Sequence, residues 1–337
     1  MRDLLEKIVQ KEEMSKELSK EIILRILDET LPEEQVAALL VALRVKGETP
    51  VEIAGFAEGI LERAIKPDLE GIKPDIDTCG TGGDGKNTWN ISTAVSLLIA
   101  SDGIKVAKHG NRCVSSTSGS ADVLETMGIK TVLAPSEVST YLKRYNFAFL
   151  FAPIFHPAMK RVANIRKNLG IKTVFNMLGP LTNPCFPRSQ IVGVPDLDTL
   201  KRLSKAANIL HKNILFYTSE SGYDEVIPSD RVYLSFSKEP ERIIEVDTYK
   251  FGLRIPEKYD LIVSTPYESA EKIMRVFSEF KEPERSILIL NAALAYLALE
   301  LIKDLREGIE RADYVLRSGK PLEIVEKMRK ENVGENN

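Results

Sequence analysis

A glycine-rich loop near residue 80 has the residue types that bind phosphate through the main chain. It runs Gly80-Thr81-Gly82-Gly83-Asp84-Gly85, and successive glycines allow backbone N–H groups to converge on phosphate oxygens. The Asn90-Ile91-Ser92-Thr93 segment would then open an apolar helix, whose free N–H groups and hydroxyls add anion donors. A glycine turn followed by an ordinary helix cap is the alternative that these residues leave open.

The same loop matches the GxGxxG pattern of dinucleotide-binding proteins, but its surroundings do not. In those proteins a helix starts within the glycines, and an acidic residue ends the next strand. Here the helix is expected only near Ser92 or Thr93, and Asp102 precedes the strand expected at Ile104–Ala107. We therefore do not expect a nucleotide-dependent dehydrogenase.

A basic segment follows the strand at Ile104–Ala107. It reads Lys108-His109-Gly110-Asn111-Arg112, and the hydroxyl-rich run Ser115–Asp122 comes shortly after it. Cations, an amide and hydroxyls at the carboxyl end of a parallel-type strand predict a phosphate-binding surface. A polar surface loop without a ligand is the alternative.

Two adjacent carboxylates, Asp224 and Glu225, follow the strand expected at Ile214–Tyr217. We expect them on an exposed turn, where they could bind one or two hard cations. Magnesium prefers oxygen ligands and keeps several waters, so one or two carboxylates plus substrate phosphates are enough to hold it. The alternative is an acidic turn that is only solvated.

Arg166 is expected to face inward from a helix over Pro157–Leu169 that ends at Gly170. Met159, Val162 and Leu169 form the apolar row of this helix, and Arg166 falls within that row. A buried guanidinium must be paired or must face a ligand cavity. Both a substrate contact and a buried salt bridge remain open from the pattern.

The chain has three histidines, His109, His156 and His211. His109 and His156 lie next to the motifs above, whereas His211 lies between a helix and a strand. An isolated histidine is more often structural than catalytic. The pattern therefore favours a structural His211 and leaves both roles open for the other two.

The first 65 residues have helix signals and no strand signal. Two helices are expected at Arg2–Lys11 and Lys16–Asp28. A third would start from a Thr30 capping box and end at Gly47, and a fourth would start from a second box at Thr49. Four short helices of this kind predict a small bundle-like unit.

The remainder of the chain alternates short apolar strands with helical stretches, which predicts an α/β domain with a central mixed or parallel sheet flanked by helices. A linker containing Pro67, Gly71 and Pro74 separates it from the helical unit. The strands are expected at Ile104–Ala107, Thr131–Leu133, Phe147–Ala152, Ile191–Val194, Ile214–Tyr217 and Leu261–Val263.

The composition is that of an ordinary globular protein. The 46 basic and 49 acidic residues leave a formal charge of −3, so no basic excess predicts a nucleic-acid or membrane partner. The longest apolar run, Ile287–Leu299, contains Asn291 and is too short to span a bilayer. Three widely spaced cysteines and a charged N-terminus predict free thiols in the cytoplasm.

Together the motifs resemble those of the anthranilate phosphoribosyltransferase family. The matching segments are GTGGDG at Gly80–Gly85, NIST at Asn90–Thr93, KHGNR at Lys108–Arg112, SGSAD at Ser118–Asp122, HPAMKRVANIRKNLG at His156–Gly170, TVFNMLGPLTNP at Thr173–Pro184 and the Asp224-Glu225 pair. The resemblance covers nearly the whole chain. Each segment alone is weak, and their joint occurrence in this order is specific.

The resemblance implies a nucleoside phosphorylase-type phosphoribosyltransferase fold, in which a small helical domain is hinged to a large α/β domain. We expect the small domain over residues 1–66, joined by part of about 163–182, and the large domain over 72–337. The implied reaction transfers phosphoribosyl from phosphoribosyl pyrophosphate to the anthranilate amine, with Mg²⁺, in tryptophan biosynthesis. A homodimer through the helical domain is also implied.

The family's contacts fall on specific residues of this sequence. For phosphoribosyl pyrophosphate they are Gly80, Gly83, Asp84, Thr88, Asn90, Ser92, Thr93, Lys108, Asn111, Arg112, Ser115, Ser116 and Ser120. For anthranilate they are Gly80, His109, Asn111, His156, Arg166 and Pro180, and for Mg²⁺ they are Ser92, Asp224 and Glu225. Lys108 and Asp84 are expected to act electrostatically, and no residue is assigned as an acid–base catalyst.

The chain departs from the usual family pattern at Trp89, Thr117 and Tyr223, none of which removes a ligand atom. Two other functions remain as alternatives. A pyrimidine-nucleoside phosphorylase would share the fold type but should have a different lysine-, serine- and glycine-rich signature in place of KHGNR. A non-catalytic paralogue that binds nucleic acid should have a basic surface and lack the acidic pair.

Overall fold

The computed structural model describes residues 1–82, 85–112 and 118–334. Its centre is a seven-stranded sheet in the order β3-β2-β1-β4-β5-β6-β7. Strands β1 to β5 run parallel, and β6 and β7 are antiparallel. The strands are β1 (Ile76–Gly80), β2 (Val106–Gly110), β3 (Phe147–Phe151), β4 (Ser189–Gly193), β5 (Ile214–Ser219), β6 (Arg231–Phe236) and β7 (Ile244–Asp247). The expected α/β class with a mixed sheet is confirmed.

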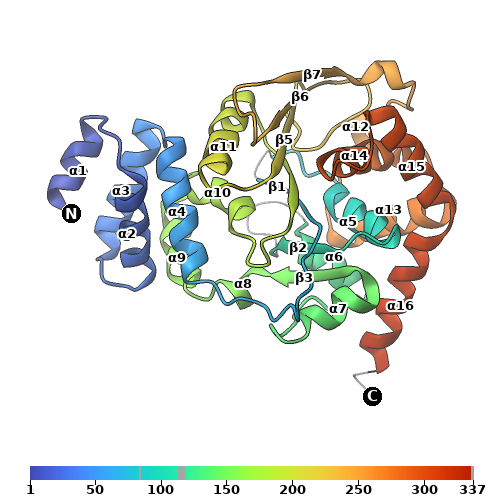
Figure 1. Cartoon of the computed structure of the whole chain (residues 1–337), viewed down its shortest axis with the longest axis horizontal. Helices are drawn as coiled ribbons and strands as arrows, with labels where there is room; N and C mark the ends of the chain where they lie inside the picture. The colour runs from blue at the N-terminus through green and yellow to red at the C-terminus, as the bar shows by residue number, and fades with distance from the viewer. Residues whose placement is uncertain (83–84, 113–117, 335–337) are drawn as a thin grey trace.

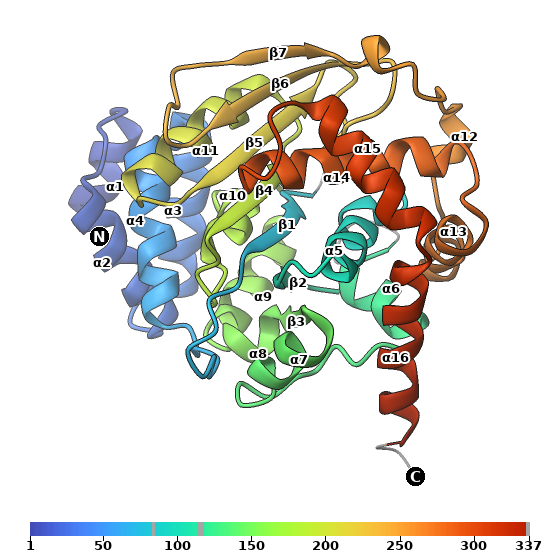
Figure 2. The same ribbon diagram turned by 45° about the vertical axis from the view of Figure 1, so that its right-hand side comes forward.

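Helices cover both faces of the sheet (Figure 1, Figure 2). Successive strand residues point to opposite faces. Ile191 of β4 therefore joins a core formed with α5, α13, α14 and α15, whereas Val192 joins a core formed with α11 and the N-terminal helices. The helices after β1 are α5 (Ile91–Ser101), α6 (Ser120–Thr126), α7 (Val138–Tyr145), α8 (Ala152–Phe155), α9 (Met159–Leu169), α10 (Phe175–Leu178), α11 (Leu197–Ile209), α12 (Lys258–Leu261), α13 (Pro266–Glu279), α14 (Glu284–Ala298), α15 (Leu305–Arg317) and α16 (Lys320–Gly334), with 3-10 turns η1 (Gly179–Thr182) and η2 (Thr248–Phe251).

The N-terminal helices form a separate layer at the left of Figure 1. They are α1 (Arg2–Val9), α2 (Lys16–Leu27), α3 (Glu33–Lys46) and α4 (Pro50–Glu62). The Thr49 capping box is confirmed, because Thr49 Oγ1 accepts from Glu52 N–H and the Glu52 carboxylate accepts from Thr49 N–H. The Thr30 box is wrong: Pro32 is the N-cap of α3, and the Thr30 hydroxyl donates to the Arg25 carbonyl.

Helix α9 returns to the N-terminal layer and contacts α2 and α3. Its buried residues, Val162 and Ile165, share a core with the helices of that layer. The helix ends where expected, because Gly170 adopts a left-handed conformation with φ 65° that favours glycine. Arg166 is thus carried to the junction between the N-terminal layer and the sheet.

Two expected strands are wrong. Residues Thr131–Leu133 form no strand, because the run lies between the Gly128 turn and α7 and pairs with no neighbouring strand. The run at Leu261–Val263 ends helix α12 and makes only an isolated bridge between Ile262 and Thr88. Strands β1, β6 and β7 were not expected. In β1, an aspartate and a terminal glycine reduce the apparent β-propensity of a strand whose first three residues are buried.

Candidate active site

The motifs expected to bind substrates meet at the carboxyl ends of the parallel strands. The chain runs from β1 outward to β2 and β3, and then crosses to β4 and β5 on the other side of β1. The strand order therefore reverses between β1 and β4, and a crevice forms outside the carboxyl ends at such a point. The glycine loop follows β1, the basic segment ends β2, His156 follows α8 after β3, and the acidic pair follows β5.

The acidic pair is held against the glycine loop. The Gly82 N–H donates to Asp224 Oδ2 at 3.2 Å, and the Thr88 hydroxyl donates to Glu225 Oε2 at 3.1 Å. A side chain at Gly80 would collide with the Asp224 carboxylate, so glycine is required there. These contacts bring the phosphate loop and the two candidate metal ligands, which are about 140 residues apart in the chain, into one site.

The expectation of an exposed acidic turn is wrong. Asp224 and Glu225 are only 7% and 9% exposed. The reason is a tertiary contact: the buried Asn291 side chain of α14 accepts from Val226 N–H at 3.0 Å and donates to the Val226 carbonyl at 2.7 Å. Asn291, the polar residue within the longest apolar run of the sequence, could have indicated this contact, since a buried amide needs hydrogen-bond partners.

The start of α5 presents polar groups toward the same crevice. Asn90 is the N-cap, but its side chain makes no cap hydrogen bond and instead binds Ser118 and Ser269. The first N–H groups of α5 are therefore left without a side-chain cap from Asn90. The buried Thr93 hydroxyl has no partner among the described residues. Unsatisfied donors at a helix N-terminus favour an anion.

Lys108 is buried beside the start of α5. Its Nζ donates to the Thr78 carbonyl at 2.5 Å and lies 3.5 Å from Ser92 Oγ. Burial lowers the pKa of Lys108, and the nearby Asp77 carboxylate opposes this shift. The ammonium group therefore lies inside the protein, next to a serine that the family resemblance implies as a ligand of both phosphate and metal.

Asp77 of β1 is a polar residue that sequence reasoning missed. Its carboxylate accepts from the His109 N–H at 3.2 Å, from Asn183 Nδ2 at 2.9 Å and from Gln190 Nε2 at 3.3 Å. Burial raises the pKa of Asp77, while Lys108 and these donors oppose the rise. Asp77 thus ties together strands β1, β2 and β4 directly beneath the site. The sequence feature that could have revealed Asp77 is an acidic residue inside a strand that leads into a glycine loop.

The basic segment continues into the described part of its loop. The Asn111 carbonyl accepts from Ser120 Oγ at 3.3 Å, which joins the end of β2 to the start of α6. Arg112 is half exposed and pairs with Glu125 at 2.6 Å and Asp122 at 3.7 Å. A phosphate bound by Arg112 would therefore compete with these two carboxylates. Gly83, Asp84, Ser115, Ser116 and Thr117 lie outside the described residues.

His109 and His156 pack against each other on the opposite face of β2 from Lys108. Their ring centroids are 5.1 Å apart in an edge-to-face arrangement. His156 Nε2 lies 2.9 Å from the Thr182 carbonyl, and Pro180 in the same turn is buried. Burial lowers the pKa of His109 to about 3 and that of His156 to about 4. Both rings are therefore neutral near pH 7, and His109 Nε2 and His156 Nδ1 have no partner among the described residues.

Arg166 is partly buried and has no salt bridge within the described residues. Its guanidinium lies 5.8 Å from the centre of the Phe175 ring. Burial lowers the pKa of Arg166, with no compensating carboxylate. The buried salt bridge that the pattern left open is absent from the described part of the chain, so the guanidinium remains available to an anion.

Among the described residues, no group of three or more His, Cys, Asp or Glu side chains could hold a metal by itself. Asp224, Glu225 and the Ser92 hydroxyl nevertheless fit magnesium, which needs only one or two protein carboxylates when substrate phosphates supply the other oxygens. No helix in the described ranges is long and apolar enough to cross a membrane. Cys79 and Cys185 are free thiols, and Cys113 lies outside the described residues.

The chain matches known proteins along nearly its full length. Residues 2–64 match the helical bundle domain of a glycosyl transferase family, and residues 73–322 match its a/b domain. An anthranilate phosphoribosyltransferase of Saccharolobus islandicus is 42% identical over 320 residues, covering 94% of this chain and 92% of that protein. One from Thermoanaerobacter is 38% identical and covers 98% of this chain and 100% of that protein.

Solved structures agree with these matches. The anthranilate phosphoribosyltransferase of Thermus thermophilus superimposes with a TM-score of 0.90 at 33% identity, covering 97% of this chain and 98% of that one. The yeast enzyme in complex with phosphoribosyl pyrophosphate and Mg superimposes with a TM-score of 0.88 at 28% identity, covering 99% of each chain. The yeast enzyme has also been solved with 4-fluoroanthranilate. The resemblance drawn from the motifs is confirmed: this chain belongs to the anthranilate phosphoribosyltransferase family.

Proposed function

We propose that this chain transfers the phosphoribosyl group of phosphoribosyl pyrophosphate to the amine of anthranilate, giving N-(5-phosphoribosyl)anthranilate and pyrophosphate. The observation that carries the proposal is the joining of the glycine loop to Asp224 and Glu225 at the switch point of the sheet. This arrangement combines backbone phosphate donors with two carboxylates for a divalent cation. Membership in a family whose relatives carry this activity supports the same reading.

Phosphoribosyl pyrophosphate is bound mainly by groups from the loops after β1 and β2. We propose that Mg²⁺, held by Asp224, Glu225 and Ser92, neutralises charge on the departing pyrophosphate. Lys108 supports this site from beneath, because its buried ammonium lies 3.5 Å from Ser92 Oγ. The proposed contacts are Gly80, Gly83, Asp84, Thr88, Asn90, Ser92, Thr93, Lys108, Asn111, Arg112, Ser115, Ser116 and Ser120.

In this scheme the protein catalyses the reaction mainly by positioning the two substrates and by stabilising the charge that develops on the leaving pyrophosphate. The bond from ribose C1 to pyrophosphate breaks, so negative charge grows on the leaving oxygens while positive charge develops on the ribose. Donors already aimed at the leaving group lower this barrier without reorganising. The anthranilate amine attacks as an uncharged nucleophile, so no strong base is needed, and neutral His109 and His156 are consistent with that.

Anthranilate is proposed to lie on the side of the site that faces α9 and η1. Arg166 has no carboxylate partner among the described residues, and its planar guanidinium suits the anthranilate carboxylate. The acceptor nitrogens of His109 and His156 would face the amine and the ring edge. The full proposed set is Gly80, His109, Asn111, His156, Arg166 and Pro180.

The assay that tests this proposal follows anthranilate fluorescence with purified protein. We expect consumption only when phosphoribosyl pyrophosphate and a divalent cation are both present. Addition of a chelator should stop the reaction, and Mg²⁺ should restore it. Phosphorolysis of uridine or thymidine without consumption of anthranilate would instead assign the chain to the nucleoside phosphorylases.

The helical unit is proposed to form a homodimer interface. Val41 and Val45 are 37% and 79% exposed on one face of α3, and Val9 at the end of α1 is 70% exposed. Such apolar side chains on adjacent helices gain by burial against a partner. Light scattering should give about twice the chain mass of 37.7 kDa. Replacing both Val41 and Val45 with Glu should give the monomer mass, whereas Val132→Glu, at an exposed site elsewhere, should not.

The domain bounds and the cellular location belong to the same proposal. We propose a small domain over residues 1–66 that is joined by part of about 163–182, and a large domain over 72–337. The contacts of α9 with α2 and α3 support the return of the chain to the small domain. The free thiols of Cys79 and Cys185 suit a reducing compartment, and we propose the cytoplasm.

A further inference from the structure

A basic groove lies at the opposite end of the sheet from the active site. Its volume is ≈ 490 Å³, and it is bounded by helices α2 and α4, the linker after α4, and the turns that precede β4 and β5. The residues that carry the argument are Lys20, Lys66, Lys73, Phe186, Arg188 and Lys212. Because β4 and β5 begin here and end at the active site, the two sites are separated by the length of the strands.

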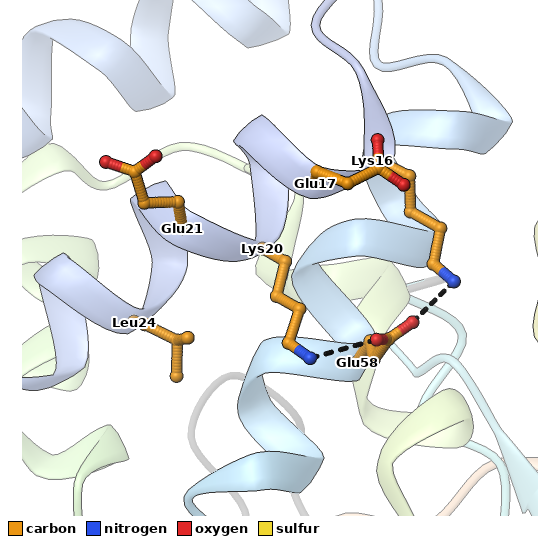
Figure 3. Close-up of a pocket in the computed structure, with 6 residues that line it drawn as sticks. All are labelled: Lys16, Glu17, Lys20, Glu21, Leu24 and Glu58. Atoms are coloured by element: carbon orange, nitrogen blue, oxygen red, sulfur yellow. Dashed lines mark hydrogen bonds and ion pairs between the residues drawn. The ribbon is translucent and has the colours of Figure 1, made fainter.

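The groove has an excess of positive charge. Five Lys or Arg side chains and two carboxylates line it, and Arg188 also lies 3.9 Å from the Asp75 carboxylate outside the groove. The two carboxylates are already in use: Glu58 pairs with Lys16 and Lys20, and Glu62 pairs with Lys20. Figure 3 shows the Glu58 pairs in an adjoining shallow pocket, where both lysines of α2 point toward this one acid. Lys66, Lys73 and Lys212 have no salt bridge within the described residues.

Lys212 is the most informative of these cations. Its amine lies over the Phe186 ring, 5.1 Å from the ring centre, and makes no hydrogen bond or ion pair within the described part of the chain. Burial lowers the pKa of Lys212 to about 8. A desolvated ammonium without an anion is costly, so an anion that enters the groove would relieve this cost.

The turns that hold Lys212 have unusual backbone conformations. Phe186 has a φ of 48° and His211 a φ of 53°, although neither is glycine. Left-handed conformations are uncommon for residues other than glycine, and His211 adopts one directly after the C-cap of α11. Both turns are nevertheless fixed by backbone hydrogen bonds, from Phe186 to Asn183 and from His211 to Asn208. The exposed Phe186 ring and the Lys212 amine over it are therefore held at the groove by hydrogen-bonded turns.

We propose that this groove binds a small, multiply charged phosphate compound that bridges the helical unit and the α/β domain. Three uncompensated cations suit a di- or trianion better than a single carboxylate, since each added charge gains a further attraction. A volume of ≈ 490 Å³ is sufficient for a compound of one or two phosphates. Lys66 lies at the end of the helical unit and Lys212 in the α/β domain, so an anion bound to both would link the two.

Binding of inorganic phosphate, pyrophosphate and ribose 5-phosphate to the full-length protein tests the proposal, measured by equilibrium dialysis at low salt without anthranilate. The active site also binds phosphate, so the informative quantity is the difference between variants. Lys212→Gln should remove one bound equivalent per chain, or weaken that class of sites about tenfold, as expected for loss of one charge-assisted contact. Lys205→Gln is the matched control, because Lys205 lies on neighbouring α11, outside the groove, and pairs with Glu241.

A second variant protects the test against misfolding of Lys212→Gln. Lys66 and Lys73 are exposed, so Lys66→Gln/Lys73→Gln should fold normally and should weaken the same class of sites. The probe whose binding differs most between wild type and the groove variants identifies the kind of phosphate compound that the groove prefers. Equal stoichiometry and affinity for all three probes in wild type, both groove variants and the control would overturn the proposal. Since no turnover is measured, this outcome is independent of the proposed transferase activity.

Discussion

The buried carboxylate of Glu52 in the helical unit differs from the polar groups at the carboxyl end of the sheet in how its hydrogen bonds are satisfied. Glu52 of α4 is fully buried, and its carboxylate accepts from Met14 N–H at 3.0 Å, Thr49 N–H at 2.9 Å and Lys46 Nζ at 2.8 Å. All three donors come from the chain itself. Such a group stabilises the fold and has no capacity left for a ligand.

At the carboxyl end of the sheet, several buried polar groups have no partner among the described residues. They include His109 Nε2, His156 Nδ1 and the Thr93 hydroxyl. The partly buried guanidinium of Arg166 likewise has no salt bridge within the described residues. Native proteins satisfy most buried polar groups, so a cluster of unsatisfied ones indicates where something else binds. The contrast between Glu52 and these groups separates a residue that holds the fold from residues that await a substrate.

The largest effect is expected on stability, from Glu52→Ala. The change leaves the buried Lys46 ammonium and two N–H groups unpaired, so the free energy of unfolding should fall by about 3–5 kcal/mol. Urea denaturation measures this loss. Activity per folded molecule should not change. Glu326→Ala, which removes the exposed partner of Arg329, is the control and should leave the midpoint nearly unchanged.

Removing the charges of Asp224 and Glu225 should have the opposite effect to Glu52→Ala, because activity should fall while the protein stays folded. Asp224→Asn/Glu225→Gln keeps the shape of both side chains but removes the charge that holds the metal, so turnover should fall by about 100- to 1000-fold. Circular dichroism should show a folded protein. Glu220→Gln, an exposed acid in the same loop, serves as the control. Near-normal turnover of the double variant at low Mg²⁺ would remove the pair from the metal site.

Within the described structure, helix α9 carries one paired and one unpaired arginine, Arg161 and Arg166, so the same comparison can be made within a single helix. Arg161 pairs with Glu29 at 3.2 Å and donates to the Leu31 carbonyl, whereas Arg166 has no such partner among the described residues. Arg166→Ala should raise KM for anthranilate by about 30- to 150-fold, equivalent to roughly 2–3 kcal/mol, and should leave KM for phosphoribosyl pyrophosphate unchanged. Arg161→Ala should instead lower the melting temperature. If both KM values of Arg166→Ala drifted together with its stability, Arg166 would be structural.

The smallest effect concerns acid stability. Folded-state pKa values of about 4 for His156 and about 3 for His109 lie below the ordinary histidine value. The unfolded chain therefore binds more protons than the folded chain below about pH 6.5, and stability falls as the pH falls through that window. Between pH 6 and pH 5 the loss should be about 1 kcal/mol per histidine. Urea midpoints at both pH values measure it, and His156→Gln should show a shallower dependence than wild type.

Much of the fold follows from local patterns in the sequence. The Thr49 capping box and the Gly170 helix end were predictable, because both depend on residues within one helical turn. Strands β3, β4 and β5 were found within a few residues, since their apolar runs are buried on both faces. The polar motifs after these strands predicted the site, because parallel strands bring their carboxyl ends to one edge.

The remainder depended on contacts between distant residues. Asp224 and Glu225 looked exposed in the sequence, and they are buried because Asn291 of α14, 65 residues after Val226, holds the chain there. Likewise, no local pattern shows that Asp77 lies beneath His109 or that Arg166 lacks a carboxylate partner in the described chain. The sequence by itself determined which chemical groups this protein has and which elements carry them. Only tertiary packing decided which of those groups are buried and which remain unpaired, because burial and hydrogen-bond satisfaction are set by neighbours that the local chain does not supply.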